Sequence, residues 1–399
     1  MISAQAALFA DHAPIFSQAV LASRINAFSE FPYCQKPYSK RNWGHANHSI
    51  CSYQGKLKPA IAHFLVSHFT KKGEIVLDPF SGVGTLPFEA CLQGRVGIGI
   101  DLSPIAYHNT RAKVHIPDNT RVWAAFEELL TYVESETITD LDLINSRVDN
   151  INGNLSDYYN EQTFHEILLA RRFYQKRQNE TSEYSLVFAC LFHILHGNRP
   201  YALSRRSHPL TPFKPTGGFE YRSLRSKLSA KIRRVLANVS SEQFTEGRSI
   251  LGSVFNLTEI MNREGLAGVD AILTSPPFLN STRFYIANWI RFWFAGWQAE
   301  DFRGKRPQDF LETLQSKNLA IYSQVFNQFF SVLKPNGLAV LHLGVVGNKD
   351  MGKSICDFAK AAGFQVADLI YEDVEGREKH GVRDQGTTAR HQFLFLIKP

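Results

Sequence analysis

Cysteine is scarce in this sequence, and long apolar stretches are missing from it. The five cysteines are scattered, odd in number and never in CxxC spacing, so the pattern favours neither a disulfide framework nor a zinc site. No window reaches the roughly 18 uninterrupted apolar residues of a membrane helix, and the opening MISAQAALFADHAPIF lacks both a basic start and a clean apolar stretch. We therefore expect a cytoplasmic protein without a membrane span or a metal site.

Acidic residues are not in excess, because 44 Lys and Arg face 37 Asp and Glu, which leaves a net charge of +7. This balance permits a polyanionic partner without requiring one. Internal repeats and low-complexity tracts are also missing. With 44% apolar residues, the 399-residue chain has the composition of a globular protein with a buried core, and its length predicts two or three domains.

Apolar runs alternate with helical patterns in two parts of the chain. Residues 74–102 read as a strand, a glycine loop, a helix and a second strand, which is a βαβ unit. Further strands are predicted at 248–254, 269–278, 338–346, 365–374 and 391–399, with helices at 60–69, 321–333 and 353–362. The alternation predicts an open, mainly parallel α/β sheet, and the short link between the last two strands predicts an antiparallel hairpin at its edge.

A long segment between Asp101 and Gly252 does not continue this rhythm. Helices are predicted there at 122–135, 158–178 and 183–196, so we expect an inserted, mostly helical lobe. The predicted division of the chain is an N-terminal segment (1–54), the first half of the sheet domain with the glycine loop (55–120), the inserted lobe (121–247) and the second half of the sheet domain (248–399).

The glycine loop DPFSGVGT follows a predicted strand and opens a predicted helix. Gly82 and Gly84 allow a ligand to approach the main chain, and Asp101, which ends the next strand, suits the two hydroxyls of a ribose. The spacing is GxG rather than GxGxxG, and Asp78 would repel a pyrophosphate but attract a cationic amino group. This favours S-adenosylmethionine over a dinucleotide; the alternative is a tight turn without a ligand.

The element TSPPF follows the predicted strand that ends near Leu273, at the edge where open α/β sheets bind ligands. Two prolines stiffen the chain and remove two N–H donors, which leaves acceptors beside the ring of Phe278. Such a turn suits a planar group with an exocyclic NH2, since oxygens accept its hydrogens and the ring stacks on its face. The alternative is a strand terminator with a buried phenylalanine.

Together, DPFSGVGT and TSPPF resemble the S-adenosylmethionine-dependent DNA amino-methyltransferases, which modify the exocyclic nitrogen of adenine or cytosine. The resemblance covers roughly residues 50–102 and 248–399, and it implies a Rossmann-like methyltransferase sheet of seven strands. The cofactor residues that it implies are Asp78, Pro79, Phe80, Gly82, Gly84, Thr85, Asp101 and Leu102, and the catalytic residues are Ser275, Pro276, Pro277 and Phe278.

Two further cofactor contacts follow from the same resemblance. Lys56 and Pro59, which lie before the glycine loop, match an element that lines the methionine pocket, although a basic helix start is an equal alternative. Ser253 stands where many relatives carry an acid that contacts the adenine amine, so Ser253 or Asn256 would replace that contact.

Serine at the first catalytic position is typical of relatives that methylate the 4-amino group of cytosine, whereas Asp or Asn is commoner for adenine. A neutral serine accepts a hydrogen bond but is a poor base, so we expect the proton to leave after methyl transfer, with catalysis resting on positioning and base extrusion. The choice between the two bases stays open on these residues.

The segment 199–234 carries ten Lys and Arg, one Glu and several aromatic residues. We assign target recognition to the inserted lobe, with DNA contacts from Arg205, Arg206, His208, Lys214 and Arg222 and with Asn280, Arg283 and Tyr285 gripping the flipped nucleotide. The alternative for this segment is a solvated helix at 221–239. Trp289, Trp293 and Trp297 are predicted to form a packed helix face. His193, His196 and His208 have no acid at ligand spacing, which argues against a metal site.

The leading hypothesis is a site-specific DNA methyltransferase that modifies the 4-amino group of cytosine within a restriction-modification system, with a cognate nuclease as a candidate partner. The alternatives are the same chemistry on adenine, methylation of an RNA base, and a nucleic-acid-binding protein that keeps the fold without the activity.

Overall fold

The computed structural model describes residues 17–31, 35–40, 42–53, 55–148, 154–178, 181–198, 200–208, 212–238, 243–279, 284–304, 306–373, 378–379, 382–383 and 388–399. Among these residues, no helix is both long and apolar enough to cross a membrane. Within the same ranges, Cys51, Cys91, Cys190 and Cys356 are free thiols.

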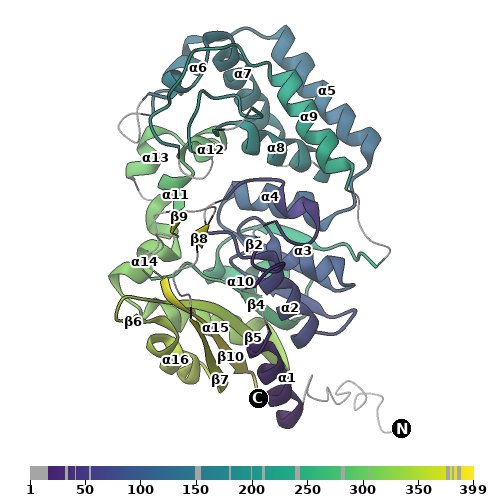
Figure 1. Ribbon diagram of the computed structural model, residues 1–399, viewed down its shortest axis with the longest axis vertical. Coiled ribbons are helices and arrows are strands. Elements are labelled where there is room, and N and C mark those ends of the chain that lie inside the picture. Colours follow the sequence, from purple (N-terminus) through teal and green to yellow (C-terminus); the bar gives the residue numbers. More distant parts are fainter. Residues whose placement is uncertain are drawn as a thin grey trace, which may run out of the picture.

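A mainly parallel sheet forms the lower half of the molecule in Figure 1. Its strands run in the order β3 (Arg248–Leu251), β2 (Val96–Asp101), β1 (Ile75–Asp78), β4 (Val269–Thr274), β5 (Leu333–Val346), β10 (Thr388–Ile397) and β7 (Gln365–Asp373). The first five are parallel, and β10 is antiparallel to both β5 and β7. The predicted Rossmann-like sheet of seven strands with an antiparallel edge is confirmed. The short strand β6 (Lys349–Asp350) also pairs with β5, and β8 (Glu378–Lys379) pairs with β9 (Val382–Arg383).

The central strands are apolar on both faces, which explains their continuous hydrophobic runs. Along β1, Val76 joins the cluster that contains α1 (Gln18–Ser29) and α2 (Pro59–Phe69), whereas Leu77 joins the cluster on the opposite face. That second cluster contains α10 (Leu257–Arg263), α15 (Ile321–Val332) and α16 (Met351–Ala361). The alternation has the period of two that a strand imposes, so the sheet lies between two helical layers.

The connection from α15 to β5 differs from the prediction. The sequence Lys334-Pro335-Asn336-Gly337 indicates the end of a helix, and α15 does end just before it. However, β5 already begins at Leu333, and these residues lie inside the strand. Asn336 takes a φ of 59° there, and the register against β4 shifts between Val269 and Ala271. The turn-like sequence therefore forms an irregularity within a long strand. Local sequence signals do not reveal that the strand continues through it.

The upper half of Figure 1 is helical. It contains α5 (Asn119–Ser135), α6 (Asp140–Ile144), α7 (Glu161–Arg177), α8 (Ser182–Ile194) and α9 (Leu224–Leu236). The predicted helices of the segment after Asp101 are confirmed to within a few residues. Side chains of Asp118, Asn160 and Ser223 cap α5, α7 and α9, so the N-termini are fixed by acceptors that local sequence supplies.

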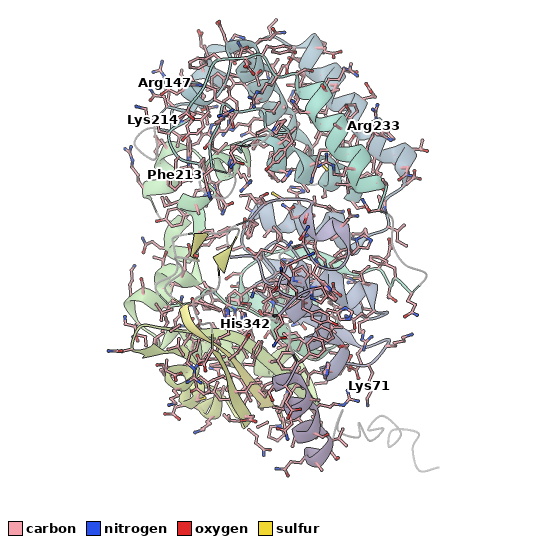
Figure 2. The ribbon with its side chains drawn as sticks, in the orientation of Figure 1. Lys71, Arg147, Phe213, Lys214, Arg233 and His342 are labelled. Carbon is pink, nitrogen blue, oxygen red and sulfur yellow. The ribbon has the colours of Figure 1, made fainter. Side chains whose placement is uncertain are left out.

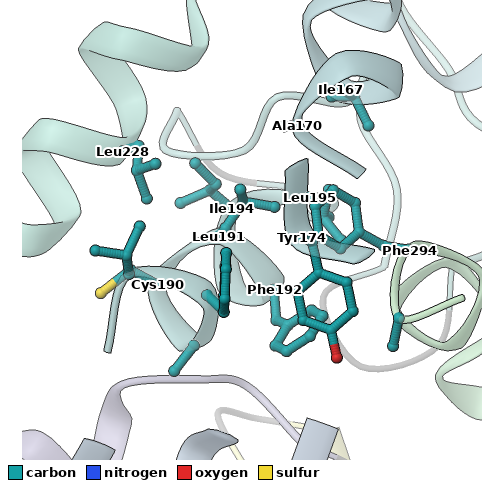
Figure 3. Close-up of a cluster of buried hydrophobic side chains, with 14 of the residues drawn as sticks. Ile167, Ala170, Tyr174, Cys190, Leu191, Phe192, Ile194, Leu195, Leu228 and Phe294 are labelled. Carbon is teal, nitrogen blue, oxygen red and sulfur yellow. The ribbon is translucent and has the colours of Figure 1, made fainter. Parts of the chain in front are cut away.

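One apolar cluster holds α5, α7, α8 and α9 together, and Figure 3 shows part of it around Tyr174, Phe192 and Phe294. Helix α12 (Trp289–Phe294), which follows the TSPPF element in sequence, belongs to this cluster. Trp289 and Trp293 are fully buried, as expected of a packed helix face, whereas Trp297 lies beyond the end of α12 but is also buried. The chain thus returns from the sheet into the lobe directly after the candidate catalytic turn.

The remaining elements are distributed over the two halves. They are α3 (Thr85–Leu92), α4 (Pro104–Val114), α11 (Phe284–Ala287), α13 (Ala299–Arg303), α14 (Leu311–Lys317) and the 3-10 turns η1 (Ala46–Ser49), η2 (Leu155–Tyr158), η3 (Val254–Asn256) and η4 (Arg306–Asp309). Helix α4 packs on β2 and β3 on one side and on α8 on the other, so it joins the sheet to the lobe.

Candidate active site

The glycine loop links the end of β1 to the start of α3. Gly82 and Gly84 take φ values of +50° and +71°, which L-residues with a side chain rarely adopt. A Cβ on Gly84 would lie 2.7 Å from Oγ1 of Thr110, so glycine also lets the start of α3 approach α4. A Cβ on Gly82 would lie 3.4 Å from the ring of Tyr53. The loop is therefore tight on its protein side, and glycine is needed at both positions.

Asp101 ends β2, the parallel neighbour of β1, and reaches this loop directly. Its Oδ2 accepts the backbone N–H of Gly82 at 2.8 Å, and its Oδ1 accepts the backbone N–H of Ser103 at 2.9 Å. Burial raises the pKa of Asp101 to about 6, against the effect of these hydrogen bonds. Two residues that the sequence nominates for one ligand are thus in contact.

Asp78, at the end of β1, connects the loop to the candidate catalytic turn. Its Oδ1 accepts the hydroxyl of Thr274 at 2.6 Å and the backbone N–H of Phe80 at 3.1 Å. Burial, with a smaller contribution from the neighbouring Asp101, raises the pKa of Asp78 to about 7, although the two hydrogen bonds act to lower it. Two carboxyl groups that are costly to ionise when no cation is beside them suit a ligand that carries positive charge.

The TSPPF turn follows the last residue of β4 and lies against β5. Ser275 Oγ is 3.0 Å from Nδ1 of His342, whose ring is buried in β5. The ring of Phe278 is half-buried and makes an edge contact with His342 at 5.3 Å between ring centroids. Figure 2 labels His342 within the sheet. The serine hydroxyl and the aromatic ring therefore share one neighbour, which the sequence analysis did not identify.

A side chain from α14 holds the main chain of this turn. The amide of Gln315 donates to the carbonyl oxygens of Pro277 at 3.0 Å and Phe278 at 3.2 Å, and its own oxygen accepts the hydroxyl of Tyr322 at 2.8 Å. The turn is expected to be rich in acceptors, but these two carbonyls already have a donor. The Ser275 hydroxyl is a further acceptor of the turn that a ligand amine could use.

The other nominated cofactor residues lie around the same edge. Pro79 and Thr85 are buried and Phe80 and Leu102 half-buried in the loop region, and Pro59 is the buried first residue of α2. Lys56 donates through Nζ to the carbonyl of His48 at 2.6 Å. Ser253 lies beyond the end of β3 and caps η3, accepting from the N–H of Phe255 at 3.3 Å. Their contacts with a cofactor stay predictions.

The residues nominated to contact a flipped nucleotide are not brought to the candidate catalytic turn in the described part of the chain. Asn280 and Arg283 lie outside the described residues. Tyr285 is only 5% exposed, and its ring lies 6.2 Å from those of Trp297 and Phe310. In this structure Tyr285 belongs to the lobe core rather than to the surface of the turn.

The basic segment divides into arginines that bind the lobe itself and side chains that face solvent. Arg205 donates to the carbonyls of Asp157 and Gly217, and it lies 4.0 Å from the centroid of Phe219. Arg222 donates to the carbonyls of Ala202 and Ser204. In contrast, the exposed side chains are those of Arg206, His208, Lys214, Phe213, Phe219 and Tyr221. Figure 2 shows Phe213 and Lys214 at the outer margin of the lobe.

His193, His196 and His208 do not form a metal site in the part of the chain that the structure describes, where no three His, Cys, Asp or Glu side chains are grouped for a metal ion. The ring of His193 stacks on Tyr201 at 4.4 Å, and its Nδ1 accepts the N–H of Ser52 at 3.2 Å. His196 lies 3.2 Å through Nδ1 from the carbonyl of His208.

Comparison with known proteins bears on the glycine loop in particular. Residues 22–113, which include the loop and Asp101, match a protein-family model described as DNA methylase. This part of the chain is similar to the DNA methylases. The matched range ends before α5, so the similarity covers β1 and β2 of the sheet and leaves the TSPPF turn and the basic segment outside it.

A 57-residue stretch is 37% identical to the Type II methyltransferase M.MjaII of Methanocaldococcus jannaschii. The stretch makes up 14% of this chain and 11% of that protein, so the chain covers only a small part of this relative. The likeness is therefore local.

Similarity to solved structures is low in both identity and TM-score. TrmN from Thermus thermophilus is 14% identical with a TM-score of 0.31, over 87% of this chain and 50% of that one. The rRNA methyltransferase aviRa from Streptomyces viridochromogenes is 9% identical with a TM-score of 0.33, over 87% of this chain and 88% of that one. Likeness at this level carries no argument about the substrate.

Proposed function

We propose that the chain is a site-specific DNA methyltransferase that transfers a methyl group from S-adenosylmethionine to the 4-amino group of a flipped-out cytosine. The hydrogen bond between Thr274 and Asp78 carries this proposal, because it joins the glycine loop to the TSPPF turn across two neighbouring parallel strands. A methyl donor bound at the loop and an amine bound at the turn would therefore meet at one edge of the sheet.

The chemistry of the loop fits this cofactor. S-adenosylmethionine carries ammonium and sulfonium charges and supplies an electrophilic methyl group when it is bound. Asp78 would hold the cationic part, since a nearby positive charge favours the ionised carboxylate over the neutral form that burial favours. Asp101 would accept hydrogen bonds from the ribose hydroxyls, while Gly82 and Gly84 let the cofactor lie against the main chain.

The turn would present the amine. Ser275 accepts one N–H, Phe278 stacks on the face of the base, and Gln315 keeps the carbonyl groups of the turn in place. The rigid Pro276-Pro277 pair holds these groups in one arrangement, so binding would align the amine nitrogen with the methyl group.

DNA is the proposed partner, because the described match is to the DNA methylases and because exposed basic and aromatic side chains gather on the lobe. Arg206, His208 and Lys214 are the proposed contacts among the exposed residues. Serine at the first position of the turn favours cytosine. A role in restriction-modification, with a cognate nuclease, is part of the same proposal.

The test is incubation of the protein with methyl-labelled S-adenosylmethionine and unmethylated genomic DNA, followed by mass spectrometry of the nucleosides. We expect 4-methylcytosine with the wild type and none with Ser275→Ala. Ser331→Ala, which changes an exposed serine on α15, is the matched control and should behave as the wild type. Finding only 6-methyladenine would change the target base, and label in RNA alone would change the substrate. Calorimetry that shows no binding of S-adenosylmethionine would favour an inactive nucleic-acid-binding protein.

A further inference from the structure

A chain of three polar side chains runs from the candidate catalytic turn into the sheet. Ser275 Oγ lies 3.0 Å from Nδ1 of His342, and Nε2 of His342 lies 3.0 Å from Nδ1 of His391. Ser275 directly follows β4, His342 lies in β5 and His391 lies in β10, and these three strands are neighbours in the sheet. His342 is only 4% exposed and stands between Leu341 and Leu343, so both of its ring nitrogens have a polar neighbour within a buried apolar strand.

The register of the strands places the two histidines on one face. His342 is opposite Phe393, and His391 is opposite Gly344, which makes the histidines diagonal neighbours. Their ring centroids are 4.8 Å apart with the planes inclined by 30°. The pair is therefore fixed by backbone pairing of β5 with β10 and does not depend on a loop.

Gly344 joins this pair to the catalytic turn. A Cβ at this position would lie 2.6 Å from Cδ2 of Phe278, so glycine leaves room for the ring. Phe278 then makes edge contacts with both imidazoles, at 5.3 Å for His342 and 6.0 Å for His391. The histidine pair and the TSPPF turn thus form one packed unit.

The protonation of His342 follows from its surroundings. Burial lowers the pKa of His342 well below 6.5, and the positive charges of His391 and Lys58 lower it further. Glu372, which is opposite His391 on β7, is the acidic group on the far side of the pair. A neutral His342 has one N–H and one lone pair. With the hydrogen on Nε2, the ring donates to His391 and accepts the hydroxyl of Ser275, which leaves the serine oxygen free to accept an amine N–H.

We infer that His342 and His391 act through Ser275 as the acceptor of the proton that the amino group loses during methylation. This inference rests on the proposed function. It answers a chemical difficulty of the turn, namely that a neutral serine alone is a poor base. His342 and His391 are positioning and proton-relay residues, since Ser275 is the group that touches the substrate.

The transfer balances in atoms and charge. The amine nitrogen forms a bond to the methyl carbon while the carbon–sulfur bond breaks, so the positive charge moves from sulfur to nitrogen. The nitrogen then gives one proton to Ser275 Oγ as the serine hydroxyl proton passes to Nδ1 of His342. The resulting imidazolium shares its Nε2 proton with His391, from which the proton leaves to solvent when the product has departed.

The experiment measures single-turnover methyl transfer to DNA between pH 5 and 9 for the wild type, His342→Gln and His391→Gln. Glutamine keeps a donor and an acceptor but takes up no proton in this range. We expect the wild-type rate at saturating cofactor to fall only towards the acid end of this range, since the pKa of His342 lies well below 6.5, and His342→Gln to be slower by about tenfold at pH 8 without that fall. His391→Gln should move the wild-type profile, while cofactor affinity stays unchanged in both. His165→Gln, a partly exposed histidine on α7, is the matched control.

The outcomes separate this inference from the proposed function. If the wild type transfers no methyl group to DNA, the proposed function fails. If the wild type is active and His342→Gln keeps both its rate and its pH profile, the relay is wrong. Nitrogen-15 NMR of the wild-type histidines gives a second readout that does not depend on the folding of a variant. A hydrogen on Nδ1 of His342 at pH 7, with Nε2 bare, would overturn the proposed direction of the relay.

Discussion

The carboxyl edge of the sheet and the basic segment of the lobe were both expected to carry function, but the structure treats their side chains differently. At the sheet edge the nominated residues meet one another, because Asp101 accepts the N–H of Gly82 and Asp78 accepts the hydroxyl of Thr274 beside Ser275. In the basic segment, Arg205 and Arg222 turn inward to carbonyl groups of the lobe. Parallel strands fix where their ends point, whereas an irregular segment uses its charges to satisfy its own backbone.

The two regions also differ in how their charged side chains affect the stability of the fold. Asp78 is buried and Asp101 is half-buried, and both have raised pKa values, so ionising either carboxyl group destabilises the ligand-free fold. The inward arginines have the opposite effect, since each places a cation on carbonyl oxygens that would otherwise lack a donor. The carboxyl groups at the sheet edge therefore destabilise the ligand-free fold when they ionise, whereas the inward arginines of the segment stabilise the lobe.

The largest expected effect contrasts a glycine of each region. Gly84→Ala puts a Cβ 2.7 Å from Oγ1 and 2.8 Å from Cα of Thr110, on a backbone with φ of +71°. Gly217→Ala has a φ of +88° but meets nothing within 4 Å. We expect Gly84→Ala to lower the free energy of unfolding by about 3 kcal/mol or more and Gly217→Ala by about 1 kcal/mol. Urea denaturation of both variants measures the difference, and equal losses would contradict the tight loop.

The second prediction concerns the ionisation of the buried carboxyl group of Asp78. Its pKa of about 7 in the folded chain is above the ordinary 3.8, so the stability from its protonated form is complete below pH 4 and is lost as the pH rises to 7. Asp78→Asn keeps an acceptor for Thr274 and removes the ionisation. Without cofactor, we expect the variant to be more stable than the wild type at pH 8 by on the order of a few kcal/mol, about 1.4 kcal/mol for each unit by which folding raises the pKa, with the difference vanishing near pH 4.

The same variant should bind the cofactor more weakly, because the carboxylate that would hold the cationic part is gone. Thermal denaturation across pH 4 to 8 measures the first effect, and titration calorimetry with S-adenosylmethionine at pH 8 measures the second. Asp357→Asn, which changes an exposed carboxyl group on α16 and away from the loop, is the control for the change of charge. A variant that is less stable than the wild type at pH 8 would show that ionised Asp78 stabilises the ligand-free fold.

The sequence predicts the sheet edge well because its signals are local. The strand, glycine loop and helix of residues 75–92 stand next to one another in the chain, and the proline pair marks the end of β4. His342 is different. It is a polar residue within the apolar run LAVLHLGVV, which is a signal, but nothing local indicates that β5 lies beside β4 or that His391 is its partner. Such pairing depends on sheet order, which only the folded chain displays.

In the basic segment, the sequence predicts the charge but not the contacts of the side chains. A run of Lys and Arg predicts positive charge correctly, but it does not tell which side chains face solvent. The turn that contains Gly217 presents a carbonyl to Arg205, and the ring of Phe219 lies over the guanidinium. These contacts depend on the path of an irregular loop, so the nucleic-acid role of Arg205 and Arg222 stays a prediction beside a structural role that the sequence did not indicate.

The third prediction tests that structural role. Arg222→Ala removes the donors to the carbonyls of Ala202 and Ser204, which lie in the part-buried start of the segment. We expect a loss of about 1.5 kcal/mol in the free energy of unfolding, the usual value for a charged donor whose acceptors are left without it. Urea denaturation measures the loss. An unchanged stability would return Arg222 to the group of surface cations.

The smallest expected effect on stability belongs to Arg206→Ala, which removes an exposed side chain whose backbone alone pairs with Thr216. We expect the free energy of unfolding to change by less than about 0.5 kcal/mol. If Arg206 contacts a phosphate, the slope of log affinity for DNA against log salt concentration should become less steep by about one unit. Fluorescence anisotropy at several salt concentrations measures this slope. Arg222→Ala and Arg206→Ala thus sort the two kinds of arginine, since one should lose stability and the other should lose only salt-dependent affinity. The same loss of stability in both would erase the distinction between inward and outward charge in the lobe.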